Sequence, residues 1–216
     1  MAVKMITLKS REDWLKHRTR IGGSEAAAIV GYNPYLTNVE LWQIKTGQVI
    51  PEDISDKPYV QYGTQAEPLL RELFKLDFPE YKVEYVENNM WLNDKIPFGH
   101  ASLDGWLTDK DGRKGIWECK TTNIVQSMQK EKWNNRIPDN YYIQILWYMA
   151  ITEFEFCILK AQMRSDFGGM PYLQTRHYMI ERADVQEDID YLITAGARFW
   201  KNVQEVRLPD LVLPNI

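Results

Sequence analysis

The stretch from Ala101 to Thr122 constrains the fold more than any other part of the chain, because it has the pattern of a β-hairpin. Strand-like runs at Leu103–Thr108 and Lys114–Thr121 lie on either side of Asp109-Lys110-Asp111-Gly112. Acidic residues followed by glycine are typical of a tight turn between two strands. Two antiparallel strands are therefore expected to lie side by side here.

Asp104 and Glu118 face each other in this hairpin if its turn is symmetric. Directly opposed residues have Cβ atoms about 4.5–5.5 Å apart, and facing carboxylates repel. Because strand side chains alternate, Glu118 and Lys120 share one face, while Trp117 and Cys119 share the other. A divalent cation between the carboxylates would cancel their repulsion, and the lysine would complete a site for phosphodiester hydrolysis. The alternative is a solvated strand face, although the apolar neighbours favour a buried strand, where charges need partners.

Length and composition favour one domain over residues 1–216, since no repeat, low-complexity tract or composition break divides the chain. No apolar run approaches the roughly 18 residues of a membrane span, and the N-terminal residues lack the apolar core of a signal peptide. The cysteines, Cys119 and Cys157, do not form a disulfide framework. We therefore expect reduced thiols and a cytoplasmic protein without membrane contact.

The formal net charge of −4 argues against indiscriminate nucleic-acid binding, since phosphate contacts need lysine and arginine. The distribution of charge matters more than its sum, and basic residues gather over 9–20 and 130–136. Such clusters are more often solvated faces than phosphate contacts. The three histidines show no metal-ligand spacing.

Arg20-Ile21-Gly22-Gly23-Ser24 precedes a small-residue helix expected over 25–30. A Gly-Gly-Ser turn that begins a helix presents backbone N–H groups and a hydroxyl, which suit a phosphate. Arg20 could contribute a fork of donors to the same group. The same residues would also make a tight turn with Ser24 as helix cap, and both interpretations stay open.

A longer helix is expected over Gln61–Leu76, where apolar residues recur with helical spacing. Pro68 fits best in a first helical turn, so we expect an irregular start there. Glu67, directly before this proline, is either a surface charge or an acid directed at the hairpin.

The C-terminal half is expected to alternate helices and strands. A helix over Asn140–Ile151 would place Gln144 and Tyr148 one turn apart on one face, and that face could also simply border the core. The later elements are two strands, a mobile glycine-rich loop between them and a final amphipathic helix: Phe154–Met163, Tyr172–Ile180, Ser165–Pro171 and Asp184–Val203.

The motifs resemble, as an ordered set, the phage λ exonuclease and YqaJ-type recombinase family within the PD-(D/E)xK nuclease superfamily. The residues that carry the resemblance are Arg20–Ser24, Gly63–Pro68, Ser102–Gly105, Glu118–Lys120, and Gln144 with Tyr148. It covers about residues 20–150 and departs from the superfamily pattern at Leu103, where proline is usual. The resemblance implies an α/β fold with a restriction-endonuclease-like core, in which α-helices flank a central mixed β-sheet.

The resemblance also implies an activity. Family members are metal-dependent exonucleases that digest one strand of linear double-stranded DNA from its end, 5′ to 3′, in phage-type recombination by strand annealing. Mg²⁺ is the expected ion, with Mn²⁺ as a substitute and two ions per site. A homotrimeric ring, a single-strand annealing protein as partner, and a phage or prophage origin in the cytoplasm of a bacterial host are further expectations.

The roles of individual residues carry over from the family in the same way. The expected metal ligands are Asp104, Glu118, the Cys119 carbonyl and, for a second ion, Glu67. Lys120 would orient or deprotonate the attacking water. The residues expected to hold the DNA or its 5′-phosphate are Arg20, Ser24, Ser102, Gln144 and Tyr148.

The chemistry of these residue types fits that interpretation. Hard oxygen ligands select Mg²⁺ or Mn²⁺ over zinc, and a lysine beside such cations in a partly desolvated pocket should have a lowered pKa. Three alternatives stay open: a structure- or site-specific endonuclease on the same fold, a non-catalytic DNA-binding module, and a metal-dependent enzyme for another phosphoester.

Overall fold

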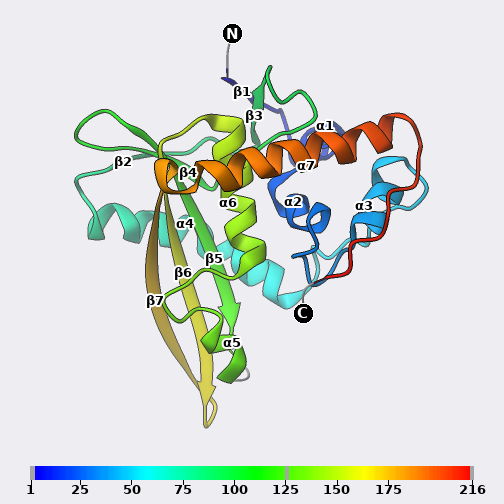
Figure 1. The fold of residues 1–216 in the computed structure, drawn as a ribbon. Helices are drawn as coiled ribbons and strands as arrows, with labels where there is room; N and C mark the ends of the chain where they lie inside the picture. Colours follow the sequence, from blue (N-terminus) through cyan, green and yellow to red (C-terminus); the bar gives the residue numbers. More distant parts are fainter. Residues whose placement is uncertain (1–2, 125–126, 215–216) are drawn as a thin grey trace.

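The computed structural model describes residues 3–124 and 127–214, in which helices lie on both sides of a central sheet (Figure 1). The strands are β1 (Val3–Thr7), β2 (Lys82–Glu84), β3 (Asn89–Asn93), β4 (Gly105–Thr108), β5 (Lys114–Asn123), β6 (Phe156–Phe167) and β7 (Met170–Glu181). The helices are α1 (Arg11–His17), α2 (Gly23–Ile29), α3 (Asn38–Lys45), α4 (Pro58–Asp77), α5 (Ser127–Glu131), α6 (Asp139–Thr152), the 3₁₀ turn η1 (Arg182–Val185) and α7 (Gln186–Gln204).

The central sheet has the strand order β2-β4-β5-β6-β7. β5 and β6 are parallel, and the other neighbours are antiparallel. A parallel pair needs a crossover connection, which here contains α6. The sheet is therefore mixed, as expected. β1 pairs with β3 in a separate two-stranded sheet, which the sequence did not reveal.

The β4–β5 hairpin has the register expected from a symmetric turn. Gly105 pairs with Trp117, and the pairing continues through Thr108 and Lys114. Asp104 lies one residue before β4, so the first strand is shorter than expected at its start. The register brings Asp104 to the level of Glu118, where the ladder ends.

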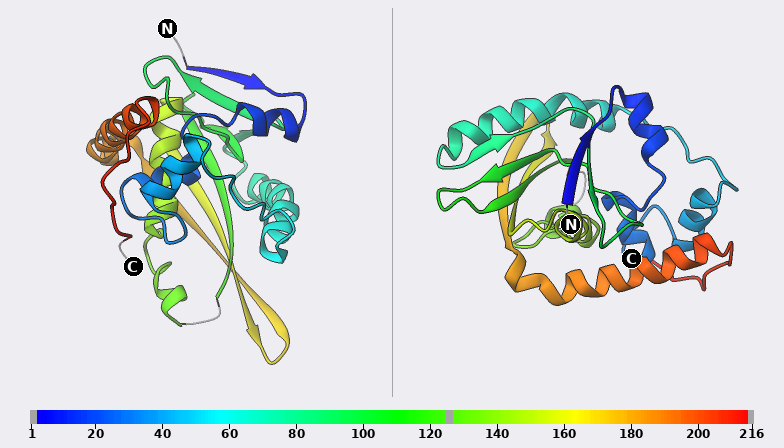
Figure 2. Two further views of the ribbon diagram at one scale, coloured as in Figure 1. Left: turned by 90° about the vertical axis from the view of Figure 1, so that its right-hand side faces the viewer. Right: turned by 90° about the horizontal axis from the view of Figure 1, so that it is seen from above.

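The two faces of β5 contact different helices, as the alternation of its side chains predicts. Trp117 and Cys119 belong to a small core cluster with Leu70 and Phe74 of α4. Glu118, on the opposite face, accepts a hydrogen bond from α6. Seen from above, α4 lies on one side of the sheet and α6 and α7 lie on the other (Figure 2). The larger core cluster fills the space between the sheet, α2, α6 and α7.

Helix α4 corrects two expectations. It begins at Pro58, which occupies the favoured first helical position, and Pro68 lies inside the helix instead of at its start. Leu70 and Phe74 are buried, whereas Leu69 and Leu73 are 67% and 49% exposed. A single helix face therefore packs on the sheet, and the remaining leucines lie in solvent.

The expectation of a mobile loop at Ser165–Pro171 is wrong. β6 continues through Phe167 and β7 begins at Met170, so the two strands form one long hairpin. The turn consists of Gly168 and Gly169, both at positive φ, which glycine adopts without steric cost. The glycine-rich stretch therefore forms a tight turn between two long strands.

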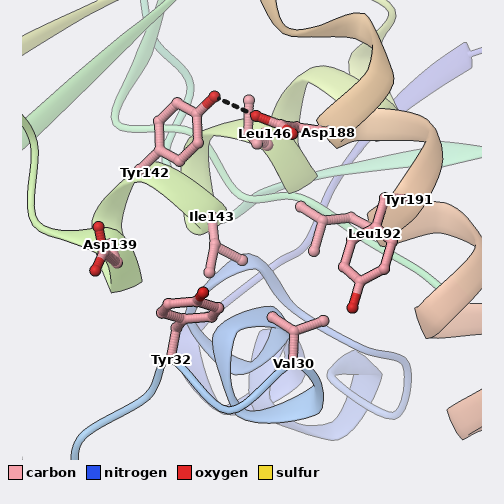
Figure 3. Close-up of a pocket in the computed structure, with 9 residues that line it drawn as sticks. All are labelled: Val30, Tyr32, Asp139, Tyr142, Ile143, Leu146, Asp188, Tyr191 and Leu192. Atoms are coloured by element: carbon pink, nitrogen blue, oxygen red, sulfur yellow. Dashed lines mark hydrogen bonds between the residues drawn. The ribbon is translucent and has the colours of Figure 1, made fainter. Parts of the chain in front are cut away.

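A cavity of about 410 Å³ opens between α2, α6 and α7, on the face of α6 away from the sheet (Figure 3). The Tyr142 hydroxyl donates to Asp188 Oδ2 at 2.8 Å and so ties α6 to α7. Apolar side chains of α6 and α7, including Ile143 and Leu192, lie in the same cavity. Within residues 3–124 and 127–214, no helix is both long and apolar enough to cross a membrane.

Candidate active site

Several expected site residues meet where the β4–β5 hairpin, α4 and α6 come together. Asp104 directly precedes β4, Glu118 and Lys120 lie on β5, and Glu67 lies on α4. A cleft of about 810 Å³ opens beside them, and its walls include Glu67, Ser102 and Asp104. Arg11 and Trp14 of α1 also line this cleft.

Glu118 is the most buried acid of the site, at 1% exposure. Its Oε1 accepts from Lys120 Nζ at 2.7 Å and from Gln144 Nε2 at 3.0 Å. The same Gln144 amide donates to the Tyr148 hydroxyl at 2.9 Å. Gln144 and Tyr148 therefore share a face of α6 that is directed at the acidic cluster. Oε2 of Glu118 is buried and has no hydrogen-bond partner within the described residues.

Asp104 is fixed by the neighbouring strand. Its Oδ2 accepts from the Cys119 main-chain N–H at 2.9 Å. In an antiparallel ladder the N–H and C=O of one residue point toward the same neighbour, so the Cys119 carbonyl also faces the Asp104 side. This arrangement is compatible with the expected carbonyl ligand. The Cys119 side chain points into the small core instead, and burial raises the pKa of its thiol.

The acidic residues of the site all have raised pKa values, and burial is the main cause for each. Burial, and then the charge of Asp104, raise the pKa of Glu118 to about 8 despite the attraction of Lys120. Burial and Asp104 likewise raise the pKa of Glu67 to about 7. The pKa of Asp104 is raised as well, mainly by burial. Lys120 and Arg71 supply two positive charges to three carboxylates, so the cluster favours additional positive charge.

The Lys120 pKa is raised in the protein without bound cations, so the lowering expected beside divalent cations stays a prediction. Burial lowers this pKa, but Glu118 and Asp104 together outweigh burial and stabilise the ammonium form. The polypeptide alone therefore holds Lys120 charged. A lowered pKa requires that other cations first neutralise these carboxylates.

The arginine beside Ser24 is Arg18 and not the expected Arg20. Arg18 Nη2 donates to Ser24 Oγ at 3.3 Å and to Glu25 Oε1 at 3.2 Å. Arg20 donates from Nε to the Pro97 carbonyl at 2.8 Å. Arg18 lies four residues after Trp14, and its guanidinium is 5.6 Å from that indole ring. This spacing was the available sequence signal for Arg18.

Ser24 is exposed and does not cap the helix, because Gly22 occupies the N-cap position of α2. The carboxylate of Glu25, at the third helical position, accepts from the Gly22 N–H at 2.8 Å, as the acidic residue of a capping box does. The Ser24 hydroxyl is thus available at the surface, beside Arg18. Gly23 allows α2 to approach α6, since a Cβ there would lie 2.3 Å from the Tyr148 ring.

Ser102 connects α1 to the start of the hairpin. Its hydroxyl accepts from Trp14 Nε1 at 2.9 Å and donates to the Asn89 carbonyl at 2.8 Å. Its one proton is therefore used within the fold. His100, near the Gly22 turn, is buried, and burial lowers its pKa to about 4, so this histidine stays neutral.

The model of the YqaJ-like viral recombinase domain matches residues 13–155. The chain belongs to this family. Within this YqaJ-like domain the matched residues include the acidic cluster, both residues on α6 and the cleft-lining residues other than Arg11.

The YqaJ-like chain is also similar to a curated relative and to three solved structures. The Bacillus subtilis (strain 168) protein named "Uncharacterized protein YqaJ" is 32% identical over 195 residues, which are 89% of this chain and 56% of that protein. The chain therefore spans about half the length of this curated relative. An alkaline exonuclease, LHK-Exo of Laribacter hongkongensis, matches with a TM-score of 0.63 at 18% identity, over 90% of this chain and 95% of that chain.

The complex of LHK-Exo with dAMP matches with a TM-score of 0.60 at 17% identity, over 91% of this chain and 96% of that chain. A phage related exonuclease from Haemophilus somnus 129PT matches with a TM-score of 0.59 at 14% identity, over 87% and 96%. At these identities the likeness establishes the fold. It confirms the expected core of a mixed sheet flanked by helices.

The atoms that could serve as metal ligands determine which ion the YqaJ-like site suits. Within the described residues, no three histidine, cysteine, aspartate or glutamate side chains are grouped so that they could hold a metal ion by themselves. The available donors are hard oxygens, and the buried Glu118 Oε2 is one that lacks a partner. Such an open, oxygen-lined arrangement suits Mg²⁺, which binds through one or two carboxylates and keeps several waters.

Proposed function

We propose that this YqaJ-like domain is a metal-dependent nuclease that digests one strand of linear double-stranded DNA from its 5′ end. The observation that carries the proposal is the cluster of Glu67, Asp104 and Glu118 around Lys120, in which burial raises the pKa of all three carboxyls and the charge of Asp104 further raises those of Glu67 and Glu118. Buried like charges are strongly destabilising unless cations or donors compensate them. A cluster of this kind is suited to cations and a phosphodiester.

Mg²⁺ is the proposed ion, with Mn²⁺ as a substitute. Asp104, Glu118 and the Cys119 carbonyl would hold one ion, and Glu67 would support a second. When bound, such ions generate a nucleophile from water and stabilise the leaving oxygen of an in-line displacement.

The residues of the chain position the other reacting groups. Gln144 fixes the rotamer of Glu118 from α6, so that Oε2 stays directed into the site. Lys120, held as an ammonium between Glu118 and Asp104, would orient the attacking water through Nζ. Once these carboxylates are neutralised, Nζ can release a proton and then accept one from that water. Tyr148 limits the movement of Gln144 through their hydrogen bond.

Recognition of the DNA end is proposed to depend on Arg18 and Ser24. Both groups are near the surface and already in contact, and an arginine fork with a hydroxyl matches the oxygens of a terminal phosphate. Arg20 is less suited, since its Nε is bonded to a main-chain carbonyl. Ser102 would act indirectly, because its hydroxyl is occupied by Trp14 and Asn89.

The biological setting is proposed from the family name and from one surface feature. A viral recombinase family supports a role in phage-type recombination beside a single-strand annealing protein, in the cytoplasm of a bacterial host. Exposed leucines recur along α4 at Leu69, Leu73 and Leu76, and such a stripe supports contact between copies, as in a homotrimer.

Digestion of three matched DNAs with Mg²⁺ tests the proposal: a linear duplex with 5′-phosphates, the same duplex with 5′-hydroxyls, and a covalently closed circle. We expect rapid loss of the phosphorylated duplex, slower loss of the hydroxyl form and an intact circle. Cleavage of the circle would identify an endonuclease instead. Binding to all three DNAs without any hydrolysis would identify a non-catalytic module.

A further inference from the structure

Arg71 is a buried arginine of α4 that lies one turn after Glu67. The residue is 7% exposed. Its Nη1 donates to Glu67 Oε1 at 3.1 Å and to the main-chain carbonyl of Asp104. The guanidinium also lies over the Tyr85 ring, 3.7 Å from its centroid. One side chain therefore joins two of the acids of the site.

The contact with Asp104 occurs where the strand ladder stops. β4 begins at Gly105, so the Asp104 carbonyl lies outside the paired residues. A buried carbonyl needs a donor, and Arg71 supplies it. The backbone before β4 is thereby tied to α4, at the residue whose carboxylate enters the site.

The three acids of the cluster share one pattern of bonding. Each carboxylate has one oxygen held by the protein: Glu67 Oε1 by Arg71, Asp104 Oδ2 by the Cys119 N–H, and Glu118 Oε1 by Lys120 and Gln144. Within the described residues, the other oxygen of each carboxylate has no hydrogen-bond partner. The protein fixes the orientation of each acid and leaves one oxygen for a ligand.

We propose that Arg71 is a positioning residue that holds Glu67 and Asp104 in a single geometry, in which their free oxygens bind divalent cations. The proposal rests on the proposed function of this site and adds a residue to which no role had been assigned. Groups that orient metal ligands change metal affinity or activity by about 10–100-fold when they are replaced.

Lysine cannot fully replace Arg71 in this position. The guanidinium has several donors in a fixed plane, so it can bridge Glu67 and Asp104 while it stacks on Tyr85. A lysine ammonium is a point charge without a planar face. Arg71→Lys therefore keeps the buried charge and tests the geometry alone, while Arg71→Gln removes both.

A matched control exists on the same hairpin. Arg113 donates to Asp109 Oδ2 at 2.8 Å and to Glu181 Oε2 at 3.0 Å, near the turn and away from the acidic cluster. Arg113→Gln removes an arginine with two acidic partners from the β4–β5 hairpin, beside which Asp104 lies. Its metal binding should be unchanged.

Mn²⁺ binding to the DNA-free protein, measured by electron paramagnetic resonance or calorimetry, tests the role of Arg71. We expect Arg71→Gln and Arg71→Lys to weaken Mn²⁺ binding by about 10–100-fold. Arg113→Gln should bind like the parent. Thermal unfolding of each metal-free variant verifies that it is folded. Parent-like Mn²⁺ affinity in Arg71→Lys and Arg71→Gln would overturn the proposal.

The dependence of DNA digestion on Mg²⁺ concentration provides a second readout. For Arg71→Lys we expect a half-saturating Mg²⁺ concentration raised about 10-fold or more, with much of the rate recovered at high Mg²⁺. A lower maximal rate with unchanged Mg²⁺ dependence would refute the positioning role. If the parent binds Mn²⁺ and digests no DNA, the proposed function fails, while the affinities of the variants still decide the role of Arg71.

Discussion

Replacing Glu118 with glutamine should change how the stability of the metal-free protein depends on pH. The pKa of Glu118 is raised from 4.5 to about 8 by burial and by Asp104. A carboxyl whose folded pKa is raised contributes stability that is fully present below its unfolded pKa and is lost as pH rises through its folded pKa. Between these values the folded protein keeps a proton that the unfolded chain has released.

The magnitude follows from the linkage relation. From about pH 6 to about pH 8 the unfolded carboxyl is ionised throughout, while the folded one is first protonated and then about half ionised. At about 1.36 kcal/mol for each pH unit and each proton, Glu118 should lower the free energy of unfolding by about 2 kcal/mol over this range. The glutamine variant lacks this loss, so it should gain about 2 kcal/mol relative to the parent as pH rises.

Urea unfolding followed by tryptophan fluorescence, in a chelator at about pH 6, 7 and 8, measures the difference. The comparison between variant and parent cancels the titration of the histidines. The Lys120 ion pair adds no separate pH dependence, because that lysine stays charged over this range and its attraction is already part of the Glu118 pKa. A stability difference that does not change with pH would refute the conclusion that Glu118 is a buried carboxyl destabilised by its acidic neighbours.

The other predictions concern the ligand, the DNA end and the packing of α2. Mg²⁺ at about 100 times its dissociation constant should stabilise the parent by about 2.7 kcal/mol in thermal unfolding, and Asp104→Asn should abolish this gain. Arg18→Ala should lower the preference for 5′-phosphorylated duplexes by about 10-fold, whereas Arg20→Ala should retain it; equal losses in competition digests would contradict this assignment. Gly23→Ala should lower the free energy of unfolding by about 1–3 kcal/mol in urea, because its Cβ would meet the Tyr148 ring, while the exposed neighbour Ser24→Ala should stay within about 0.5 kcal/mol of the parent.

The sequence predicted the hairpin well because its signals are local. A turn between two runs of period-two side chains determines both the register and the face of each residue. Asp104, Glu118 and Lys120 therefore lie together as predicted. Gln144 and Tyr148 were also found from local spacing, since helix residues four apart share a face.

The errors occurred where distant residues decide the structure. Pro68 was assigned to a helix start, but Pro58 begins α4, and the packing of Leu70 and Phe74 on the sheet stabilises the helix through Pro68. Arg71 was missed because its contact with Asp104 joins residues that are 33 positions apart. Local spacing gives no signal for such a contact.

Arg20 was favoured over Arg18 for a similar reason. Arg20 is nearer to the Gly-Gly-Ser turn in sequence, but the chain between α1 and α2 directs its Nε to the Pro97 carbonyl. Arg18, at the end of α1, reaches Ser24. Proximity in sequence did not determine which guanidinium lies beside the hydroxyl, because the connection between the two helices turns.

The central claim is that Asp104, Glu118 and Lys120 form a hydrolytic centre. The rate of nucleotide release from a linear 5′-phosphorylated duplex with Mg²⁺, measured for the parent, Asp104→Ala and Lys120→Ala, tests it most directly. We predict that the parent releases nucleotides and that each variant loses about 100-fold or more in rate while it stays folded by circular dichroism. Digestion by either variant at the rate of the parent would contradict the account.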